Sequence, residues 1–147
     1  MDILNQVQIC DLICSSGQPT ERQFSEIASA GYECVINLAM PDHEQSLDNE
    51  GAIVTSLGMT YIHIPVPFDA PTEKHLLAFS GYMNSMKDRK VWVHCIVNAR
   101  VSAFLFRYLQ QHLGLPPENA VTPILEAWIP SMDNVWRDFI GYTPTDL

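Results

Sequence analysis

A cysteine and an arginine stand where a short apolar run, residues 91–93, gives way to a long helical pattern; four residues separate Cys95 from Arg100. A buried strand that turns directly into a helix directs the helix N-terminus and its free N–H groups at whatever binds beside the turn. Arginine adds a planar fork that can hold two oxygens of an anion, and the same positive field favours a cysteine thiolate. These residues predict a nucleophilic cysteine in an anion-binding loop made of Cys95, Ile96, Val97, Asn98, Ala99 and Arg100.

The order strand, histidine, cysteine, loop, arginine, helix resembles the phosphate-binding loop of protein tyrosine and dual-specificity phosphatases. More narrowly, the chain is similar to small bacterial phosphatase-like proteins with an early Ser-Gly-Gln-Pro and a later His-Cys-x-x-Asn-x-Arg-Val-Ser-Ala. Both motifs are present, at residues 16–19 and 94–103. The likeness spans nearly the whole chain, because similar phrases also occur at residues 31–38 and 59–66. It implies hydrolysis of phosphate monoesters through a cysteinyl-phosphate intermediate, with no cofactor and no metal.

The loop departs from the ordinary phosphatase pattern in its length. Such phosphatases place five residues between cysteine and arginine, followed at once by Ser or Thr. Here the gap is four residues, and the hydroxyl comes at Ser102 after Val101. The loop has no glycine, and Asn98 is its only residue that readily adopts a positive φ. Rhodanese-like sulfurtransferases also have a four-residue gap, which suits a persulfide on the cysteine, so the loop alone leaves both chemistries open.

The resemblance implies roles for three more side chains. His94 would orient the loop and help to hold the thiolate, and Ser102 would assist the thiolate as leaving group when the phosphoenzyme breaks down. Each also has an ordinary structural interpretation, as a packed histidine or a helix serine bonded to its own backbone. Asp69 falls in the loop after the third strand, where such phosphatases carry the general acid that protonates the leaving group. Glu73 and Asp42 are weaker substitutes for it.

Alternating strand and helix patterns predict the fold class. Strands are expected at residues 9–15, 34–38, 60–66 and immediately before Cys95. Helices are expected at residues 20–30, 47–57, 72–86, 99–113 and 133–140, with a short segment opened by Pro116 and Pro117. Such crossovers predict one α/β domain, residues 1–147, with a mostly parallel central sheet of four to five strands flanked by helices, as in cysteine phosphatases. Ligands bind outside the carboxyl ends of the strands in such sheets.

Composition and charge restrict the partners. The chain is 47% hydrophobic and 17% charged, which is ordinary for a soluble globular protein. Its net charge of −9 argues against nucleic acid and anionic membranes as partners, and favours a phosphorylated protein or a small phosphate ester held by a field local to the loop. Nothing in the sequence indicates an oligomeric state. Neither a signal peptide nor a membrane span is recognisable, so a reducing cytoplasm is expected. Disulfide and zinc spacings are absent from the four cysteines, Cys10, Cys14, Cys34 and Cys95.

Two alternatives come from other classes of protein. A sulfurtransferase would carry a persulfide on Cys95; the short loop favours it, whereas His94 and residues 16–19 argue against it. A non-catalytic module that binds phosphate or phosphoproteins would keep Arg100 and the loop amides without needing Cys95 or Asp69. The favoured prediction is a cysteine-dependent phosphatase that acts on phosphotyrosine, phosphoserine or a small phosphate ester.

Overall fold

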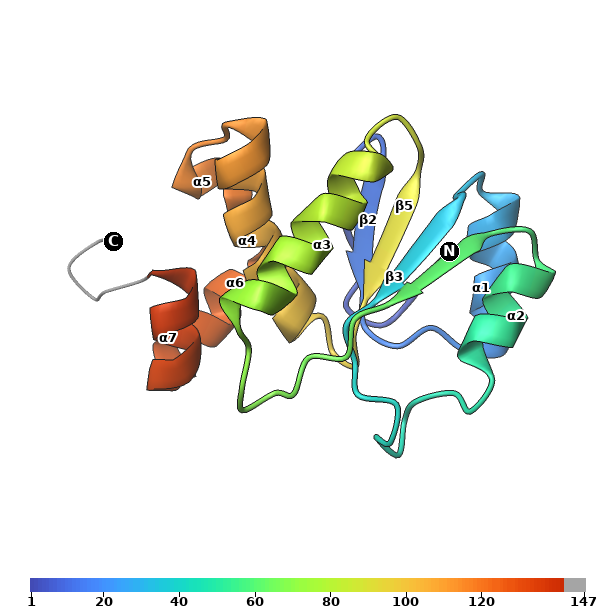
Figure 1. Ribbon diagram of the computed structural model, residues 1–147, viewed down its shortest axis with the longest axis horizontal. Coiled ribbons are helices and arrows are strands. Elements are labelled where there is room, and N and C mark those ends of the chain that lie inside the picture. The colour runs from blue at the N-terminus through green and yellow to red at the C-terminus, as the bar shows by residue number, and fades with distance from the viewer. Residues whose placement is uncertain (142–147) are drawn as a thin grey trace.

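A five-stranded sheet lies at the centre of the protein in the computed structural model, which describes residues 1–141 of the chain (Figure 1). In spatial order the strands are β1 (Val7–Cys10), β2 (Ile13–Ser16), β5 (Val91–His94), β3 (Cys34–Asn37) and β4 (Thr60–His63). β1 runs antiparallel to β2, and all other neighbours are parallel. The predicted α/β class with a mostly parallel sheet is confirmed. Residues 142–147 of the predicted domain lie outside the described residues.

Helices cover both faces of the sheet (Figure 1). One face carries α1 (Glu21–Ser29) and α2 (Glu50–Ser56). The other carries α3 (Glu73–Ser85) and α4 (Ala99–Leu113), around which the C-terminal elements gather: α5 (Pro117–Ala120), α6 (Pro123–Trp128), the 3₁₀ turn η1 (Ile129–Ser131) and α7 (Asn134–Ile140). Within residues 1–141, no helix has both the length and the apolar character needed to cross a bilayer.

The central strands are buried on both faces, which explains why they are continuous apolar runs rather than alternating ones. Successive side chains enter two different cores. Val35 and Trp92 pack with residues of α1 and α2, whereas Ile36 and Val93 pack with residues of α3, α4 and α7. The sheet is therefore a rigid base for the loops at its edge.

Local signals set the ends of several helices. Thr20 and Thr72 cap α1 and α3, and in each case the residue three positions on returns the hydrogen bond to the cap's backbone. α4 begins after Asn98 and has Gly114 as its C-cap, both in the left-handed region. Its predicted bounds are confirmed. The helix expected from residue 47 begins instead at Glu50.

Two strand predictions are wrong in extent. Residues 9–15 are not one strand, because the chain reverses at residues 11–12 and forms the β1–β2 hairpin. The strand expected at residues 60–66 ends at His63. Two prolines follow within four residues, and proline cannot donate to a strand ladder.

The carboxyl ends of the parallel strands meet at one edge of the sheet. The backbone N–H of Leu38, just after β3, donates to the carbonyl of His94 at 2.9 Å. The N–H of Val66, beyond β4, donates to the carbonyl of Leu38 at 3.1 Å. The loop after β5 therefore lies beside the segments that follow β3 and β4, as predicted for a ligand-binding edge.

Candidate active site

Cys95 follows β5 directly and lines a cavity of about 410 Å³ at this edge. The cysteine side chain is otherwise fully buried. The rest of the lining comes from the loop after β3, the segment after β4 and the start of α4: Met40, Asp42, His43, Phe68, Ile96, Val97, Ala99 and Arg100. The cavity thus joins the predicted nucleophile to the predicted anion-binding arginine.

Asn98 shapes the turn between Cys95 and α4. Its φ is 72°, a left-handed conformation that asparagine adopts more readily than most residues. Its side-chain amide donates to the carbonyl of Asn5 at 2.8 Å and to Ser15 Oγ at 3.1 Å. Its Oδ1 accepts from Ser102 Oγ at 3.3 Å. In a loop without glycine, Asn98 therefore adopts the left-handed conformation of the turn and also makes the side-chain hydrogen bonds that hold it.

The carbonyl groups of the loop are held from behind. Three successive carbonyls each accept a hydrogen bond from a donor outside the cavity: Cys95 O from His94 Nδ1 (3.0 Å), Ile96 O from Gln18 N (2.9 Å) and Val97 O from Asn5 Nδ2 (2.9 Å). Within residues 1–141, no protein acceptor engages the loop N–H groups of Ile96, Val97, Ala99 and Arg100. Outward carbonyls leave the amides free to bind an oxyanion, which is how backbone nests work.

Arg100 is the second residue of α4 and is only 6% exposed. Its Nη1 donates to the carbonyl of Val66 at 2.9 Å, and its guanidinium carbon lies 5.6 Å from the centroid of the Phe68 ring. No carboxylate pairs with Arg100 among the residues that the structure describes. Burial of an unpaired cation is costly, so the arrangement suits an anion that comes from outside the protein.

The three carboxylates considered as general acid differ in their relation to the cavity. Asp69 sits on an exposed turn, directly after Phe68, and does not line the cavity. Asp42 does line it. Glu73 forms an ion pair with Arg107, and this hydrogen-bonded partner holds the pKa of Glu73 below its usual value. The cavity therefore contains a carboxylate that sequence reasoning ranked below Asp69.

Ser102 lies behind the loop rather than in the cavity. It is fully buried and donates to Asn98 Oδ1. It also accepts a hydrogen bond from Thr122 Oγ1 at 2.8 Å. Its partners are thus two side chains, not the helix backbone, and its contact with the loop runs through Asn98.

The Ser-Gly-Gln-Pro segment packs against the back of the same loop. Besides the bond from Gln18 N to Ile96 O, the segment makes a very close approach at Gly17. A Cβ there would lie 2.5 Å from Ile96 O, closer than any real contact. Ser16 Oγ accepts from the indole Nε1 of Trp92 at 2.8 Å, which ties the segment to β5. The motif therefore supports the loop from behind and does not enter the cavity.

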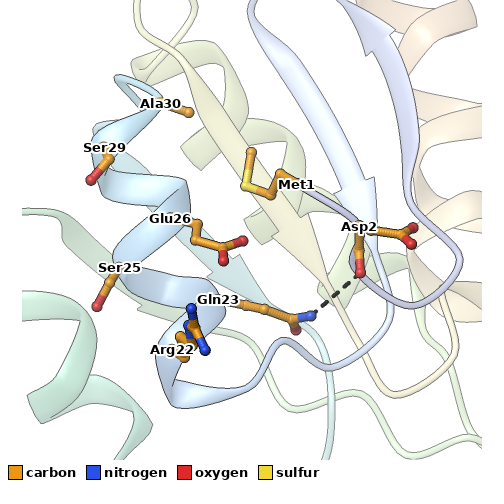
Figure 2. Close-up of a pocket in the computed structure, with 8 residues that line it drawn as sticks. All are labelled: Met1, Asp2, Arg22, Gln23, Ser25, Glu26, Ser29 and Ala30. Atoms are coloured by element: carbon orange, nitrogen blue, oxygen red, sulfur yellow. Dashed lines mark hydrogen bonds between the residues drawn. The ribbon is translucent and has the colours of Figure 1, made fainter.

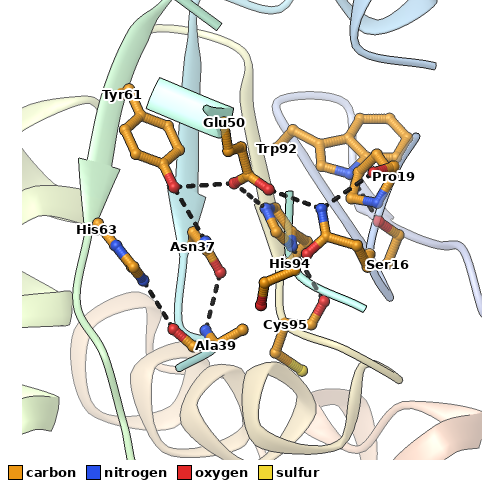
Figure 3. Close-up of polar contacts among 12 residues, drawn as sticks. Ser16, Pro19, Asn37, Ala39, Glu50, Tyr61, His63, Trp92, His94 and Cys95 are labelled. Carbon is orange, nitrogen blue, oxygen red and sulfur yellow. Dashed lines mark hydrogen bonds and ion pairs between the residues drawn. The ribbon is translucent and has the colours of Figure 1, made fainter. Parts of the chain in front are cut away.

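Behind Cys95 lies a polar cluster with a buried centre that sequence reasoning missed (Figure 3). Its centre is Glu50, the first residue of α2, which is only 4% exposed. Glu50 Oε2 lies 2.7 Å from His94 Nε2 and accepts from the Tyr61 hydroxyl at 2.9 Å. Glu50 Oε1 accepts from Gln18 Nε2 at 2.6 Å. We call these four residues the Glu50 cluster.

The electrostatics of this cluster favour an ionised Glu50. Burial raises the pKa of the carboxyl group, but the hydrogen bond and charge of His94, helped by Gln18 and Tyr61, outweigh it, so the pKa lies below its ordinary value. Burial and the neighbouring carboxylate raise the pKa of Tyr61. A glutamate in the first turn of a helix is usually solvated, so no local signal in the sequence marks Glu50 as buried.

A second hollow, of about 780 Å³, lies on the surface between the N-terminus and α1 (Figure 2). It contains no cysteine and shares no lining residue with the Cys95 cavity; its walls are Met1, Asp2, Arg22, Gln23, Ser25, Glu26, Ser29 and Ala30. No group of three or more His, Cys, Asp or Glu side chains is gathered for a metal ion anywhere in residues 1–141. The chemistry that the side chains offer is concentrated in the smaller cavity.

Fold and loop together define a cysteine-based phosphatase of the tyrosine and dual-specificity type. Residues 5–121 match the family described as DSP-PTPase phosphatase fused to NAD+ kinase, and the chain belongs to that family. It is also 33% identical over 93 residues to the beta-lactamase hydrolase-like protein of Xylella fastidiosa strain Temecula1. That match covers 60% of this chain but 21% of the relative, so the chain spans about a fifth of the length of this relative.

Solved structures agree with the family assignment. A Shewanella putrefaciens CN-32 protein assigned as a phosphatase (DUF442) superposes with a TM-score of 0.85 at 33% identity, covering 95% of this chain and 90% of its own. Tk-PTP in its active form superposes with a TM-score of 0.72 at 21% identity, covering 93% and 94%. The first likeness extends to the sequence, and the second is a likeness of fold. The predicted resemblance to this superfamily is confirmed.

Proposed function

We propose that the protein hydrolyses phosphate monoesters through a cysteinyl-phosphate intermediate. The observation that carries this proposal is that Cys95 and Arg100 line one cavity while the loop carbonyls beside them are held outward. An oxyanion placed there would meet backbone amides, a helix N-terminus and a guanidinium, and no negative side chain of the loop itself.

The reaction has two displacements at phosphorus. The Cys95 thiolate attacks in line, an S–P bond forms, and the ester P–O bond breaks while a carboxylic acid gives the leaving oxygen a proton. The loop amides and Arg100 hold the equatorial oxygens. Water then attacks phosphorus, the carboxylate takes its proton, the S–P bond breaks, and inorganic phosphate and the thiolate are released. We assign Ser102 to this step through Asn98, whose position it helps to fix.

Asp69 is the proposed general acid, and Asp42 is its rival. The turn that carries Asp69 adjoins the cavity, because the preceding side chain, Phe68, lines it and lies over Arg100. The resemblance to phosphatases also favours this loop. Asp42 has the advantage of lining the cavity directly. Protonation of the leaving group matters most for poor leaving groups, so a comparison of the two asparagine variants separates these assignments.

The proposed substrate is a phosphorylated protein side chain or a small phosphate ester. Arg100 and the loop amides place the positive field inside the cavity, whereas the chain as a whole carries a charge of −9. A long polyanion would meet repulsion over the rest of the surface. We also propose a reducing cytoplasm as its location, since a nucleophilic thiolate is lost to oxidation elsewhere.

Turnover of a small aryl phosphate, without metal and from mildly acidic to neutral pH, tests the proposal. Wild type should release phosphate, Cys95→Ser should not, and Cys10→Ser should behave as wild type, because Cys10 is an exposed cysteine outside the cavity. A folded but inactive wild type, or a fully active Cys95→Ser, would contradict a thiol phosphatase. Thiosulfate is then the next substrate to offer, as a test of sulfur transfer.

A further inference from the structure

The two ring nitrogens of His94 both face acceptors. Nδ1 lies 3.0 Å from the carbonyl oxygen of Cys95, and a carbonyl oxygen can only accept. Nε2 lies 2.7 Å from Glu50 Oε2. A neutral imidazole has one N–H and would leave one of these contacts without a proton, unless the carboxyl group supplied it. The ring is fully buried, so water cannot relieve the mismatch.

The surroundings of Glu50 place the shared proton on the histidine. Oε2 already accepts from the Tyr61 hydroxyl, and Oε1 accepts from the Gln18 amide. The Gln18 orientation is fixed, because the same amide nitrogen also donates to the carbonyl of Pro19. A carboxylate that accepts several hydrogen bonds is held in its ionised form, in agreement with the lowered pKa of Glu50. His94 then carries protons on both nitrogens.

We propose that Glu50 is a positioning residue of the phosphatase reaction: it keeps His94 as a buried imidazolium that pins the Cys95 carbonyl away from the cavity and places a positive charge behind the nucleophile. The expected effect on turnover rests on the proposed function. The number of protons on His94 does not, because it can be measured without any activity.

The groups that face His94 come from four elements. α2 supplies Glu50, whose carboxylate also holds the Tyr61 hydroxyl of β4. From α1, the Phe24 ring lies 5.8 Å away in an edge-on arrangement and carries no charge. β5 continues into Cys95, which receives the second ring proton on its carbonyl. Among these groups, only the Glu50 carboxylate carries a charge that compensates the imidazolium. Of the two charged groups, the positive His94 is the one next to Cys95.

This arrangement has two consequences at the nucleophile. The Cys95 carbonyl cannot turn into the cavity, where it would repel a phosphate oxygen. The nearer positive charge also favours a thiolate over a thiol, because the carboxylate that balances it lies on the far side of the ring. Figure 3 shows Glu50, Tyr61 and His94 on one side of Cys95 and the sulfur directed away from them.

The first test counts protons directly in the wild-type protein. Nitrogen-15 imidazole spectra at pH 8 should show both His94 nitrogens protonated, although a free histidine is neutral there. A neutral His94 ring at pH 8 would overturn the proposal, whether or not the protein is a phosphatase. This measurement needs no variant, so it does not depend on whether a substituted protein folds.

The second test measures the thiolate. The rate of Cys95 alkylation by iodoacetamide, followed by mass spectrometry across pH, should reach half its maximum about one pH unit higher in Glu50→Gln than in wild type. Tyr61→Phe is the matched comparison: it removes one hydrogen bond from the same oxygen but keeps the charge, so its midpoint should move less than that of Glu50→Gln. A Glu50→Gln profile that coincides with wild type in a folded protein would leave Glu50 as a structural residue only.

Discussion

The two sides of the proposed phosphate-binding loop, residues 95–100, are built in opposite ways. On the side away from the cavity, Glu50 and His94 are buried and every polar atom of the pair has a partner. On the cavity side, Asp42 and His43 are exposed, and the ring of Phe68 is 45% exposed. The side that we propose to hold the nucleophile and the oxyanion is thus fixed in advance, whereas the side that would meet the leaving group is open.

This difference suits the two demands of phosphoryl transfer. The three equatorial oxygens are the same in every monoester, so a preorganised cradle serves all of them. Leaving groups vary in size and basicity, so a rigid surface around them would restrict the substrates. We expect substitutions on the closed side to change the geometry of the loop, and substitutions on the open side to change which substrates are used.

The largest effect should come from the residue that joins the two sides. Arg100→Ala should lower kcat/KM for an aryl phosphate by about 10³-fold, since it removes a preorganised charge on the oxyanion. Arg100→Lys should recover little of this, because an ammonium lacks the planar fork. Vanadate binding should fall in parallel. Arg22→Ala, at an exposed position of α1, is the control and should match wild type. Vanadate binding that survives Arg100→Ala would contradict the assignment of Arg100 to the oxyanion site.

The second largest effect concerns the carboxylates on the cavity side of the loop. Asp69→Asn should slow turnover of alkyl phosphates by about 10²-fold and of phosphates with good leaving groups by much less, as expected for a lost general acid. Asp42→Asn should have a smaller effect that does not depend on the leaving group. If the two variants exchange these behaviours, the cavity-lining Asp42 is the acid.

A smaller effect should come from the contact at Gly17 on the closed side. Gly17→Ala would force a Cβ against Ile96 O, so either the motif segment or the loop must shift. We expect a loss of about 1–3 kcal/mol in the free energy of unfolding by urea, together with reduced activity. Gly81→Ala in α3 is the matched control, because nothing lies within 4 Å of the added methyl group. It should stabilise by about 0.5–1 kcal/mol, and equal behaviour of the two variants would contradict the close packing.

The smallest effect at neutral pH concerns the cysteines of the sheet. Burial raises the pKa of the Cys14 and Cys34 thiols to about 11. Because the folded pKa is raised, their contribution to stability is complete below the unfolded value near 8.5 and is lost as the pH rises toward 11. Over that pH range, each thiol should account for a loss of about 2–3 kcal/mol in the free energy of unfolding. The free energy of unfolding, measured with urea from pH 7 to 11, should therefore fall less steeply in Cys34→Ala than in wild type. Parallel plots of this free energy against pH would contradict the account.

Features that depend on a few neighbouring residues could be predicted from the sequence. Thr20 and Thr72 mark helix starts, because a capping box is complete within four residues. α4 has Asn98 before it and Gly114 after it, the residue types that accept a left-handed backbone. The same reasoning explains why Cys95 and Arg100 could be placed beside each other, because one strand-to-helix turn sets their relation and both line the same cavity.

Features that depend on distant contacts could not be predicted. Asp11 is the only turn-favouring residue in the turn of the β1–β2 hairpin, and apolar residues lie on both sides of it, so only the pairing of β1 with β2 distinguishes two strands from one. The burial of Glu50 depends on His94, which is 44 residues away in the chain. Whether Asp42 or Asp69 lines the cavity depends on how two loops pack at the sheet edge, and residue type says nothing about that.

The burial of Arg100 has a consequence for the rate at which substrates associate. A positive charge that is 6% exposed in a chain of net charge −9 attracts an anion only at short range, while at longer range the protein as a whole repels it. Salt screens the long-range part over a Debye length of about 8 Å at physiological ionic strength and leaves the buried contact almost untouched. Capture of a dianionic ester should therefore become faster, not slower, as salt is added. The protein would discriminate against highly charged ligands before they reach the loop.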